Sequence, residues 1–272
     1  MQSFPLAFIG GGNMASAIFG GLVRGGWPAA EITVVEPGAE QRQRLVAAHP
    51  GLRALAAADA SLAQAQVVVW AVKPQTFVAA AAPCAAHVSK ALQLSVMAGI
   101  RSEAIVRASG STQVVRAMPN TPALIGQGIA GLYARPEVNA AQRADAERVL
   151  APTGRTLWVA RESDLDAVTA LSGSGPAYVF YFVEAMMDAA EQMGLTRAQG
   201  RELALATFAG ATALAQQSDE APAVLRERVT SKGGTTFAAL ESMRNDAVGE
   251  AITRALRAAE KRARELGDEF GA

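Results

Sequence analysis

The sequence has very few of the residues that form disulfides or bind metals. Its 272 residues include one cysteine, Cys84, and two histidines, His49 and His87. A single cysteine cannot form an intramolecular disulfide, and these three residues are too few for a zinc site. We therefore expect neither a disulfide nor a bound metal, and the cysteine content fits a reducing compartment.

Net charge and long apolar segments are absent as well. The 25 Lys and Arg residues balance the 25 Asp and Glu residues, so no excess positive charge indicates a nucleic-acid or anionic-membrane partner. No apolar run approaches the roughly 20 residues that span a bilayer, and no basic segment precedes the first apolar run, as it would in a signal peptide. We expect a cytoplasmic protein with no nucleic-acid or membrane partner.

The hydrophobic pattern changes near residue 160. Before it, short β-branched runs alternate with alanine-rich helical stretches, which is typical of a doubly wound, mainly parallel α/β sheet. After Ser163, apolar residues recur only at helical spacing. Thr196 and Gln199 fit a capping box after a Gly194 cap, and Asp246 is expected to start the last helix. The sequence thus predicts an α/β domain at 1–160 and an all-helical domain at 161–272. Strands are predicted at residues 6–10, 32–36, 67–72, 92–98, 114–118, 128–133 and 156–159, with a helix at 139–150.

The first predicted strand is followed by a glycine turn and then by a helical pattern. The turn has the spacing Gly-x-Gly-x-x-Ala, in which Gly10 permits a tight turn, Gly12 lets a pyrophosphate approach the backbone and Ala15 allows close helix packing. N–H groups at the start of the helix attract the same anion. A flexible turn is the alternative, but the position after a buried strand favours a Rossmann-type dinucleotide site formed by Gly10, Gly11, Gly12, Asn13 and Met14.

Charged residues after the second predicted strand bear on the choice of cofactor. Glu36 ends that strand, where an acidic residue accepts hydrogen bonds from the adenosine ribose of NAD and repels a 2′-phosphate. Arg42 and Arg44 follow, and they offer a phosphate-binding alternative if the chain turns back. The alternative for Glu36 is an exposed carboxylate at a strand end, and the alternative for the two arginines is a solvated helix surface. We expect Glu36 to contact the cofactor, and both NADH and NADPH remain open.

Two more strand ends point to the same crevice, because ligands bind at the carboxyl edge of such sheets. After the third predicted strand, we expect the backbone to contact the cofactor. The side chain of Lys73 could contact it too, but it is equally well explained as a solvated lysine at the end of a strand. After the fifth, Asn120 is expected to orient the nicotinamide ribose or a neighbouring loop, and a proline-stiffened turn is its alternative. The cofactor residues predicted after the third strand are Ala71, Val72, Lys73 and Pro74.

The helical domain contains a second glycine turn. Residues 231–240 read as a turn that leads into a helix, with Thr235 near the N-cap and Thr236 in the first turn. Free N–H groups at such a helix start form a carboxylate site, although an ordinary capping pair also explains the threonines. The predicted substrate-binding residues are Ser231, Gly233, Gly234, Thr235 and Thr236.

A long helical pattern precedes this turn and has two unusual segments. Residues 172–176 contain two glycines and a proline, which should break the helix. This bend either lines the active site or permits a close helix crossing. Residues 178–183 are apolar on more than one helix face, so we expect a second chain to cover them.

Together these motifs resemble the pyrroline-5-carboxylate reductase family. The likeness lies in residues 9–14, 71–74, 116–122, 171–178 and 233–236, which follow the family's order over nearly the whole chain. It implies the last step of proline biosynthesis, the reduction of 1-pyrroline-5-carboxylate to L-proline with NADPH or NADH. It also implies an intertwined homodimer, with larger rings as an extension, and a catalytic hydrogen bond between the Thr236 hydroxyl and the ring nitrogen. Lys232 departs from the family's pattern, because proline often precedes the two glycines.

Reduction of a cyclic imine carboxylate makes modest demands on acid–base chemistry. The iminium carbon is already electrophilic, so positioning supplies most of the catalysis, and neither histidine falls in a motif. The alternative is an oxidoreductase like the β-hydroxyacid dehydrogenases, which place a catalytic lysine after the glycine run. Residues 176–184 contain no lysine. A non-enzymatic NADP sensor would not need the second glycine turn.

Overall fold

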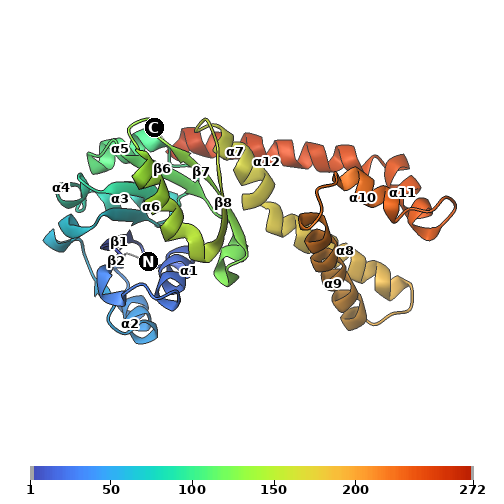
Figure 1. Cartoon of the computed structure of the whole chain (residues 1–272), viewed down its shortest axis with the longest axis horizontal. Coiled ribbons are helices and arrows are strands. Elements are labelled where there is room, and N and C mark those ends of the chain that lie inside the picture. Colours follow the sequence, from blue (N-terminus) through green and yellow to red (C-terminus); the bar gives the residue numbers. More distant parts are fainter. Residues whose placement is uncertain (1–2, 271–272) are drawn as a thin grey trace. The chain divides into compact units, whose positions relative to one another are not determined.

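The computed structural model describes residues 3–270, and the chain divides into two compact units (Figure 1). One unit contains the residues up to Ser174 together with those from Ala259 onward, and it is called the sheet unit below. The other is Gly175–Ala258, the helical unit.

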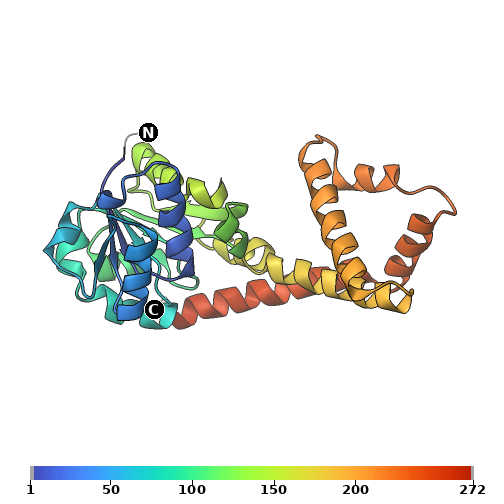
Figure 2. The same cartoon turned by 90° about the horizontal axis from the view of Figure 1, so that it is seen from below.

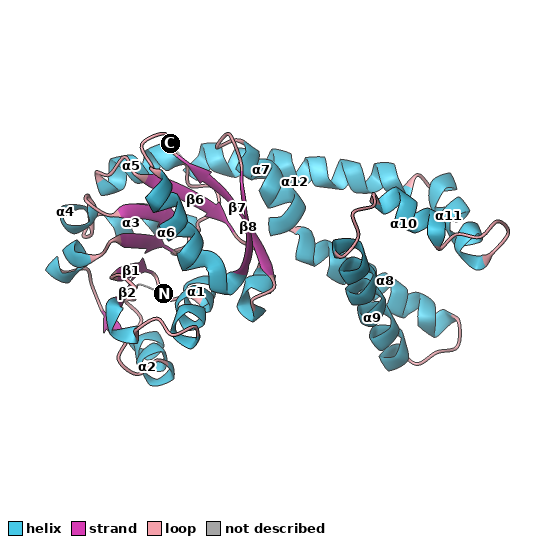
Figure 3. Cartoon of the chain, in the orientation of Figure 1, coloured by secondary structure: helices cyan, strands magenta, loops and turns pink. Residues whose placement is uncertain are grey.

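The sheet unit is built on one eight-stranded sheet with the strand order β3-β2-β1-β4-β5-β6-β7-β8 (Figure 3). All neighbouring strands are parallel except β6 and β7. Because the strand order reverses between β1 and β4, the sheet is doubly wound, as predicted. The strands are β1 Leu6–Ile9, β2 Ile32–Val35, β3 Arg53–Leu55, β4 Val67–Trp70, β5 Leu92–Ser95, β6 Val114–Met118, β7 Gly128–Ala134 and β8 Gly154–Trp158.

Helices cover both faces of this sheet. In β1, Leu6 and Phe8 join a buried cluster with side chains of α1, α2 and α6, whereas Ala7 and Ile9 join a second cluster with α3, α4 and α5. Burial on both faces explains why these strands are continuous apolar runs in the sequence. The helices are α1 Asn13–Arg24, α2 Ala39–Ala48, α3 Phe77–Ala81, α4 Ala85–Val88, α5 Ser102–Ser109, α6 Ala140–Leu150 and α7 Asp164–Val168. Short 3-10 turns span Ala29–Glu31, Ala60–Gln64, Pro74–Thr76, Thr121–Ile125 and Ala151–Thr153, and a π-helical turn spans Thr169–Gly173.

Strand limits differ from the prediction in two ways. Strand β3 was not predicted, because its three residues lie at the edge of the sheet with Arg53 exposed and show no apolar pattern. The strands predicted at 32–36, 67–72 and 92–98 end earlier, at Val35, Trp70 and Ser95. The residues that follow β2 and β4 are the predicted cofactor residues, so the carboxyl-edge loops begin sooner than the apolar runs end.

The helical unit contains α8 Gly175–Gln192, α9 Arg197–Gln216, α10 Pro222–Arg228, α11 Thr235–Asn245 and the first part of α12 Val248–Phe270. Helices α8 and α9 pack against each other (Figure 2). The predicted capping box of Thr196 and Gln199 is present at the start of α9, after Gly194 with φ +89°. The prediction that Asp246 starts the last helix is wrong, because its N–H donates to Ser242 O and closes α11.

Within residues 3–270, none of the helices is both long enough and apolar enough to cross a membrane. The same residues include no group of three His, Cys, Asp or Glu side chains placed to hold a metal ion.

Candidate active site

The glycine turn after β1 has a conformation that only glycine adopts at its first position. Gly10 has φ +99°, and its N–H donates to Val35 O at 2.9 Å. A Cβ atom on Gly10 would lie 2.7 Å from Ala71 O, so a larger residue would separate β1 from the chain after β4. The turn therefore brings the ends of β1, β2 and β4 together at the point where the strand order reverses.

The start of α1 is open and suited to an anion. Gly12 is its N-cap, no side chain caps this end, and the first turn contains no acidic residue. A Cβ atom on Gly12 would meet no atom within 4 Å, and both Gly12 and Asn13 are exposed. Behind them, Ala15 is fully buried against the sheet. Free N–H groups and open space beside Gly12 are what a pyrophosphate needs, so the residues present fit a dinucleotide.

Glu36 stands directly after β2 and reaches the same turn. One carboxylate oxygen accepts a hydrogen bond from Gly11 N–H at 3.0 Å and the other accepts one from Gly38 N–H at 2.9 Å. Gln41, in the first turns of α2, donates its amide to Gly11 O at 2.7 Å. This contact could not be predicted from the sequence, since a glutamine on a polar helix is ordinary and its partner is 30 positions away.

The two arginines near Glu36 are engaged elsewhere. Arg42 Nη1 donates to Glu36 O at 2.8 Å and to Pro37 O at 2.7 Å, which stabilises the turn after β2. Arg44 pairs with Glu40 one helical turn away, and both side chains are largely exposed. In this structure their guanidinium groups satisfy backbone oxygens and a neighbouring carboxylate.

The segment after β4 contributes mainly its backbone. Ala71 N–H donates to Ile9 O at 2.9 Å, and Lys73 O accepts hydrogen bonds from Thr76 N–H and Oγ1, each at 2.9 Å. The side chain of Lys73 is exposed, and Pro74 begins a 3-10 turn. The structure thus places Ala71 and Val72 beside Gly10 and leaves the Lys73 ammonium in solvent.

Asn120 connects the end of β6 with two other segments. Its Oδ1 accepts a hydrogen bond from Ile129 N–H at 3.0 Å, and its Nδ2 donates to Ser172 O at 3.2 Å. Ser172 lies in the π-helical turn, where the Ser174 N–H bonds to Thr169 O. The predicted break at residues 172–176 is therefore present, and Asn120 satisfies one of the carbonyls that it leaves free. The Asn120 amide has a second hydrogen that it can donate.

A buried ion pair supports β6 beside this loop. Arg116 Nη1 donates to Glu162 Oε1 at 2.8 Å, and Ser102 donates both its N–H and its Oγ to the same carboxylate at 2.6 Å. Burial alone would raise the pKa of Glu162, but these hydrogen bonds and the Arg116 charge outweigh it and hold that pKa below its ordinary value. The pair thus joins β6, α5 and the segment before α7.

The second glycine turn lies in the helical unit. Gly233 has φ +76°, and Gly234 N–H donates to Ser231 O at 3.0 Å. Gly234 is the N-cap of α11, so Thr235 is the first helical residue and not the cap, because Gly234 keeps an extended ψ of 176°. No side chain caps this end and no acidic residue lies in the first turn. Thr236 is half-buried in that turn.

The groups most able to move protons lie outside these turns. His49 caps the end of α2 and stacks edge-on against Phe19, and burial together with the Arg24 charge lowers its pKa. His87 lies in α4. Burial raises the pKa of Cys84 to about 11, so its thiol stays protonated. The predicted site contains none of these groups, which suits a reaction with little proton transfer.

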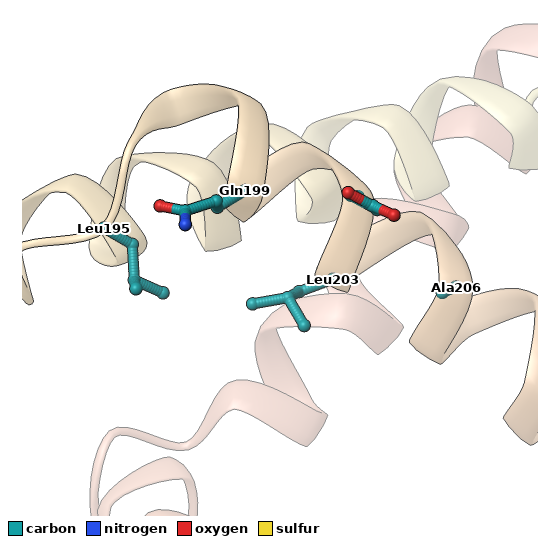
Figure 4. Close-up of a pocket in the computed structure, with 5 residues that line it drawn as sticks. Leu195, Gln199, Leu203 and Ala206 are labelled. Atoms are coloured by element: carbon teal, nitrogen blue, oxygen red, sulfur yellow. The ribbon is translucent and has the colours of Figure 1, made fainter.

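A hollow of about 430 Å³ lies on the helical unit and is separate from the predicted substrate turn. Leu195 and Leu203 face the same space (Figure 4), and both are exposed. The lining residues are Leu195, Gln199, Glu202, Leu203 and Ala206.

The doubly wound sheet and its open phosphate turn define a dinucleotide-dependent oxidoreductase. Residues 162–266 match the family model for pyrroline-5-carboxylate reductase dimerisation, and residues 5–99 match the model for NADP oxidoreductase, coenzyme F420-dependent. The chain is 43% identical over 273 residues to the pyrroline-5-carboxylate reductase of Pseudomonas aeruginosa, with 100% of both chains covered. The Haemophilus influenzae enzyme is 40% identical over 269 residues, with 98% of each chain covered.

Solved structures agree with these relatives. A pyrroline-5-carboxylate reductase from Coxiella burnetii has a TM-score of 0.91 and 34% identity, covering 97% of this chain and 99% of its own. The Plasmodium falciparum pyrroline carboxylate reductase, solved with NADP bound, has a TM-score of 0.84 and 26% identity, covering 97% of this chain and 98% of its own. The chain belongs to the pyrroline-5-carboxylate reductase family. It is an NAD(P)H-dependent oxidoreductase that acts on a small molecule, and its dimerisation region makes it a homo-oligomer.

The alternative reading as a β-hydroxyacid dehydrogenase is not supported. The full-length relatives of this chain are named pyrroline-5-carboxylate reductases, and α8 contains no lysine that could transfer a proton.

Proposed function

We propose that this chain reduces 1-pyrroline-5-carboxylate to L-proline with NAD(P)H, using one glycine turn for the cofactor and the other for the substrate. The observation that carries this proposal is that two helices, α1 and α11, begin after glycine turns without a capping side chain or an acidic residue. By contrast, the N-termini of α6 and α9 each have a complete capping box. Two uncapped helix starts match the two anions of the reaction, a pyrophosphate and a carboxylate.

The cofactor is held, in this proposal, by residues of the sheet unit. The turn at Gly10–Met14 takes the pyrophosphate, and Glu36 takes the adenosine ribose. The backbone of Ala71, Val72, Lys73 and Pro74 lines the nicotinamide side, where Asn120 offers an amide hydrogen to the second ribose. When bound, NAD(P)H supplies a hydride to the iminium carbon of the substrate.

The substrate is held by the turn before α11. The N–H groups of Thr235, Thr236 and Phe237 are free to bind the carboxylate, with Ser231 and the two glycines shaping the turn around it. The Thr236 hydroxyl accepts a hydrogen bond from the ring N–H of the iminium and so fixes its carbon for hydride attack. Positioning of this kind needs no histidine or cysteine.

The assembly follows from the apolar surface of α8. Phe180 and Tyr181 are 61% and 71% exposed in the single chain, which a soluble helix does not tolerate without a partner. We propose an intertwined homodimer in which residues 161–272 bind substrate and the second chain, while residues 1–160 bind cofactor. Each site then combines the Gly12 turn of one chain with the Thr236 turn of its partner, and rings of dimers are a further level of assembly.

Subunit complementation tests the shared site. Chains with Gly12→Val and chains with Thr236→Ala are each purified, shown to exchange subunits by differential tagging, and mixed. Heterodimers should recover some fully wild-type sites and activity well above that of either parent. If proven heterodimers stay as inactive as their parents, each site is built within one chain.

Initial rates with 1-pyrroline-5-carboxylate and each reduced nicotinamide test the reaction itself. We expect imine-dependent oxidation of the cofactor with L-proline as the product. Cofactor binding without any imine-dependent oxidation would overturn the proposed function.

A further inference from the structure

The position of Glu36 carries an inference about which nicotinamide cofactor the enzyme prefers. Both oxygens of its carboxylate are held by backbone N–H groups, one from Gly11 and one from Gly38. These bonds fix a negative charge at the end of β2, beside the phosphate turn. In sheets of this type the adenosine ribose lies at that place, with its 2′-hydroxyl toward the residue that ends β2.

A carboxylate held this way treats the two cofactors differently. Each oxygen keeps a lone pair that can accept a hydrogen bond from a ribose hydroxyl, as NADH offers. NADPH carries a phosphate monoester at the same position, with a charge of about −1.5 to −2 near neutral pH. Two anions placed next to each other repel strongly, and like charges set opposite each other are a common means of rejecting a partner.

The nearby cations that would offset this repulsion already have other partners. Arg42 Nη1 donates to the carbonyls of Glu36 and Pro37, and Arg44 is paired with Glu40 on the exposed surface of α2. Gln41, a neutral side chain at the turn, donates to Gly11 O. A 2′-phosphate would therefore have to compete with these partners for a guanidinium group, whereas the Glu36 carboxylate already stands at the end of β2.

We propose that Glu36 is the specificity-determining residue that makes NADH the preferred cofactor of this enzyme. The proposal rests on the proposed function, because it names the cofactor of that same site.

Calorimetric titration of the intact protein with NADH and with NADPH tests the preference by binding alone. Wild-type protein should bind NADH at least about tenfold more tightly, the ratio that a modest like-charge repulsion produces. Glu36→Gln should shift the ratio of the two dissociation constants about tenfold or more toward NADPH. The ratio of the two dissociation constants is the readout, because loss of the bonds to Gly11 and Gly38 should weaken the binding of both cofactors by a similar factor.

Two further variants separate Glu36 from its surroundings. Glu103→Gln removes one negative charge from α5, at a carboxylate that is 58% exposed and does not pair with Arg42 or Arg44, and it should leave the ratio unchanged. Arg42→Ala should change both affinities by the same factor. A selective loss of NADPH binding in Arg42→Ala, tighter binding of NADPH by the wild type, or an unchanged ratio in Glu36→Gln would each overturn the proposal.

These measurements distinguish a failure of the cofactor assignment from a failure of the proposed reaction. If NADH binds preferentially but neither cofactor supports imine reduction, the reaction is wrong while the assignment of Glu36 stands. If imine is reduced but NADPH binds more tightly, the reaction stands and Glu36 does not select the cofactor.

Discussion

The two units differ in where they put their apolar side chains. In the sheet unit, Trp70, Phe8, Phe19 and Phe77 are almost fully buried, in clusters on both faces of the sheet. In the described part of the helical unit, the only buried apolar side chains are those of Val183, Ala190 and Ala204, two of them alanines. The sheet unit completes its core within one chain, and the helical unit does not.

This difference gives the two units different sources of stability. Burial of apolar area is the main favourable term in folding, so a unit that leaves large aromatic side chains in solvent gains little from it. The helical unit then depends on association for its apolar cover, as obligate dimers do. Changes in the sheet unit should act within a chain, whereas changes on α8 should act on assembly first.

The largest effect is expected from a charge on the exposed face of α8. The double variant Phe180→Glu/Tyr181→Glu places two carboxylates in the proposed interface, where unpaired buried charge is strongly unfavourable. We expect loss of the dimer in sedimentation experiments and nearly complete loss of activity. Val46→Glu, at a 43% exposed valine of α2 in the sheet unit, is the control and should stay oligomeric. A double variant that remains dimeric and active would show that α8 is not covered by a second chain.

A second prediction separates binding from folding inside the sheet unit. Gly12→Val has room in the structure, since no atom lies within 4 Å of the added Cβ, but it occupies the place proposed for the pyrophosphate. We expect cofactor affinity to fall by about a hundredfold or more with little change in melting temperature. Gly10→Ala is the matched contrast. Its Cβ would lie 2.7 Å from Ala71 O at φ +99°, so it should lower the melting temperature. Equal NADH affinity for Gly12→Val and wild type in calorimetry would contradict the dinucleotide assignment.

Local patterns in the sequence were enough to predict most of this unit. Strands buried on both faces leave continuous apolar runs, and the Gly-x-Gly-x-x-Ala spacing places Gly10 and Gly12 without any tertiary information. In the helical unit, the capping box of Thr196 is an equally local signal. Where the signal was short or exposed, as in β3, the prediction failed.

Contacts between distant residues could not be predicted. Gln41 reaches Gly11 across 30 positions, Asn120 reaches Ser172 across 52, and Glu162 reaches Ser102 across 60. Each depends on how the sheet folds, and none of these residue types signals its partner. The roles of Thr236 and Glu36 toward their ligands stay predictions until they are tested.

A third prediction divides function between the units. Thr236→Ala removes the hydroxyl proposed to bind the ring nitrogen and should lower kcat by about ten- to a hundredfold, the value of a hydrogen bond to a charged group of about 1.5–3 kcal/mol. Cofactor affinity, which is proposed to depend on the sheet unit, should be unchanged. Thr230→Ala, whose hydroxyl donates to Arg226 O in the preceding helix, is the control and should keep its turnover. Wild-type turnover in Thr236→Ala would assign the role to another group.

The smallest effect concerns the ion pair of Arg116 and Glu162, which belongs to the sheet unit alone. The folded-state pKa of Glu162 lies below its ordinary value of 4.5, so the pair contributes stability above that pH and loses it as pH falls through the lower, folded-state pKa. Glu162→Gln should reduce the free energy of unfolding by about 1–2 kcal/mol at pH 7, less than for a fully buried pair because the glutamate is 22% exposed.

Urea unfolding of both proteins from pH 7 to pH 3, at one protein concentration, measures this difference. The gap between wild type and Glu162→Gln should close as pH falls below about 4.5, the pKa of a glutamate in the unfolded chain. Burial raises the pKa of Asp166, which works in the opposite direction, but Asp166 is present in both proteins and cancels from the gap. Glu103→Gln, at a 58% exposed carboxylate paired with Arg135, should show a smaller gap at every pH. A gap for Glu162→Gln that stays constant down to pH 3 would mean that its charge does not stabilise the sheet unit.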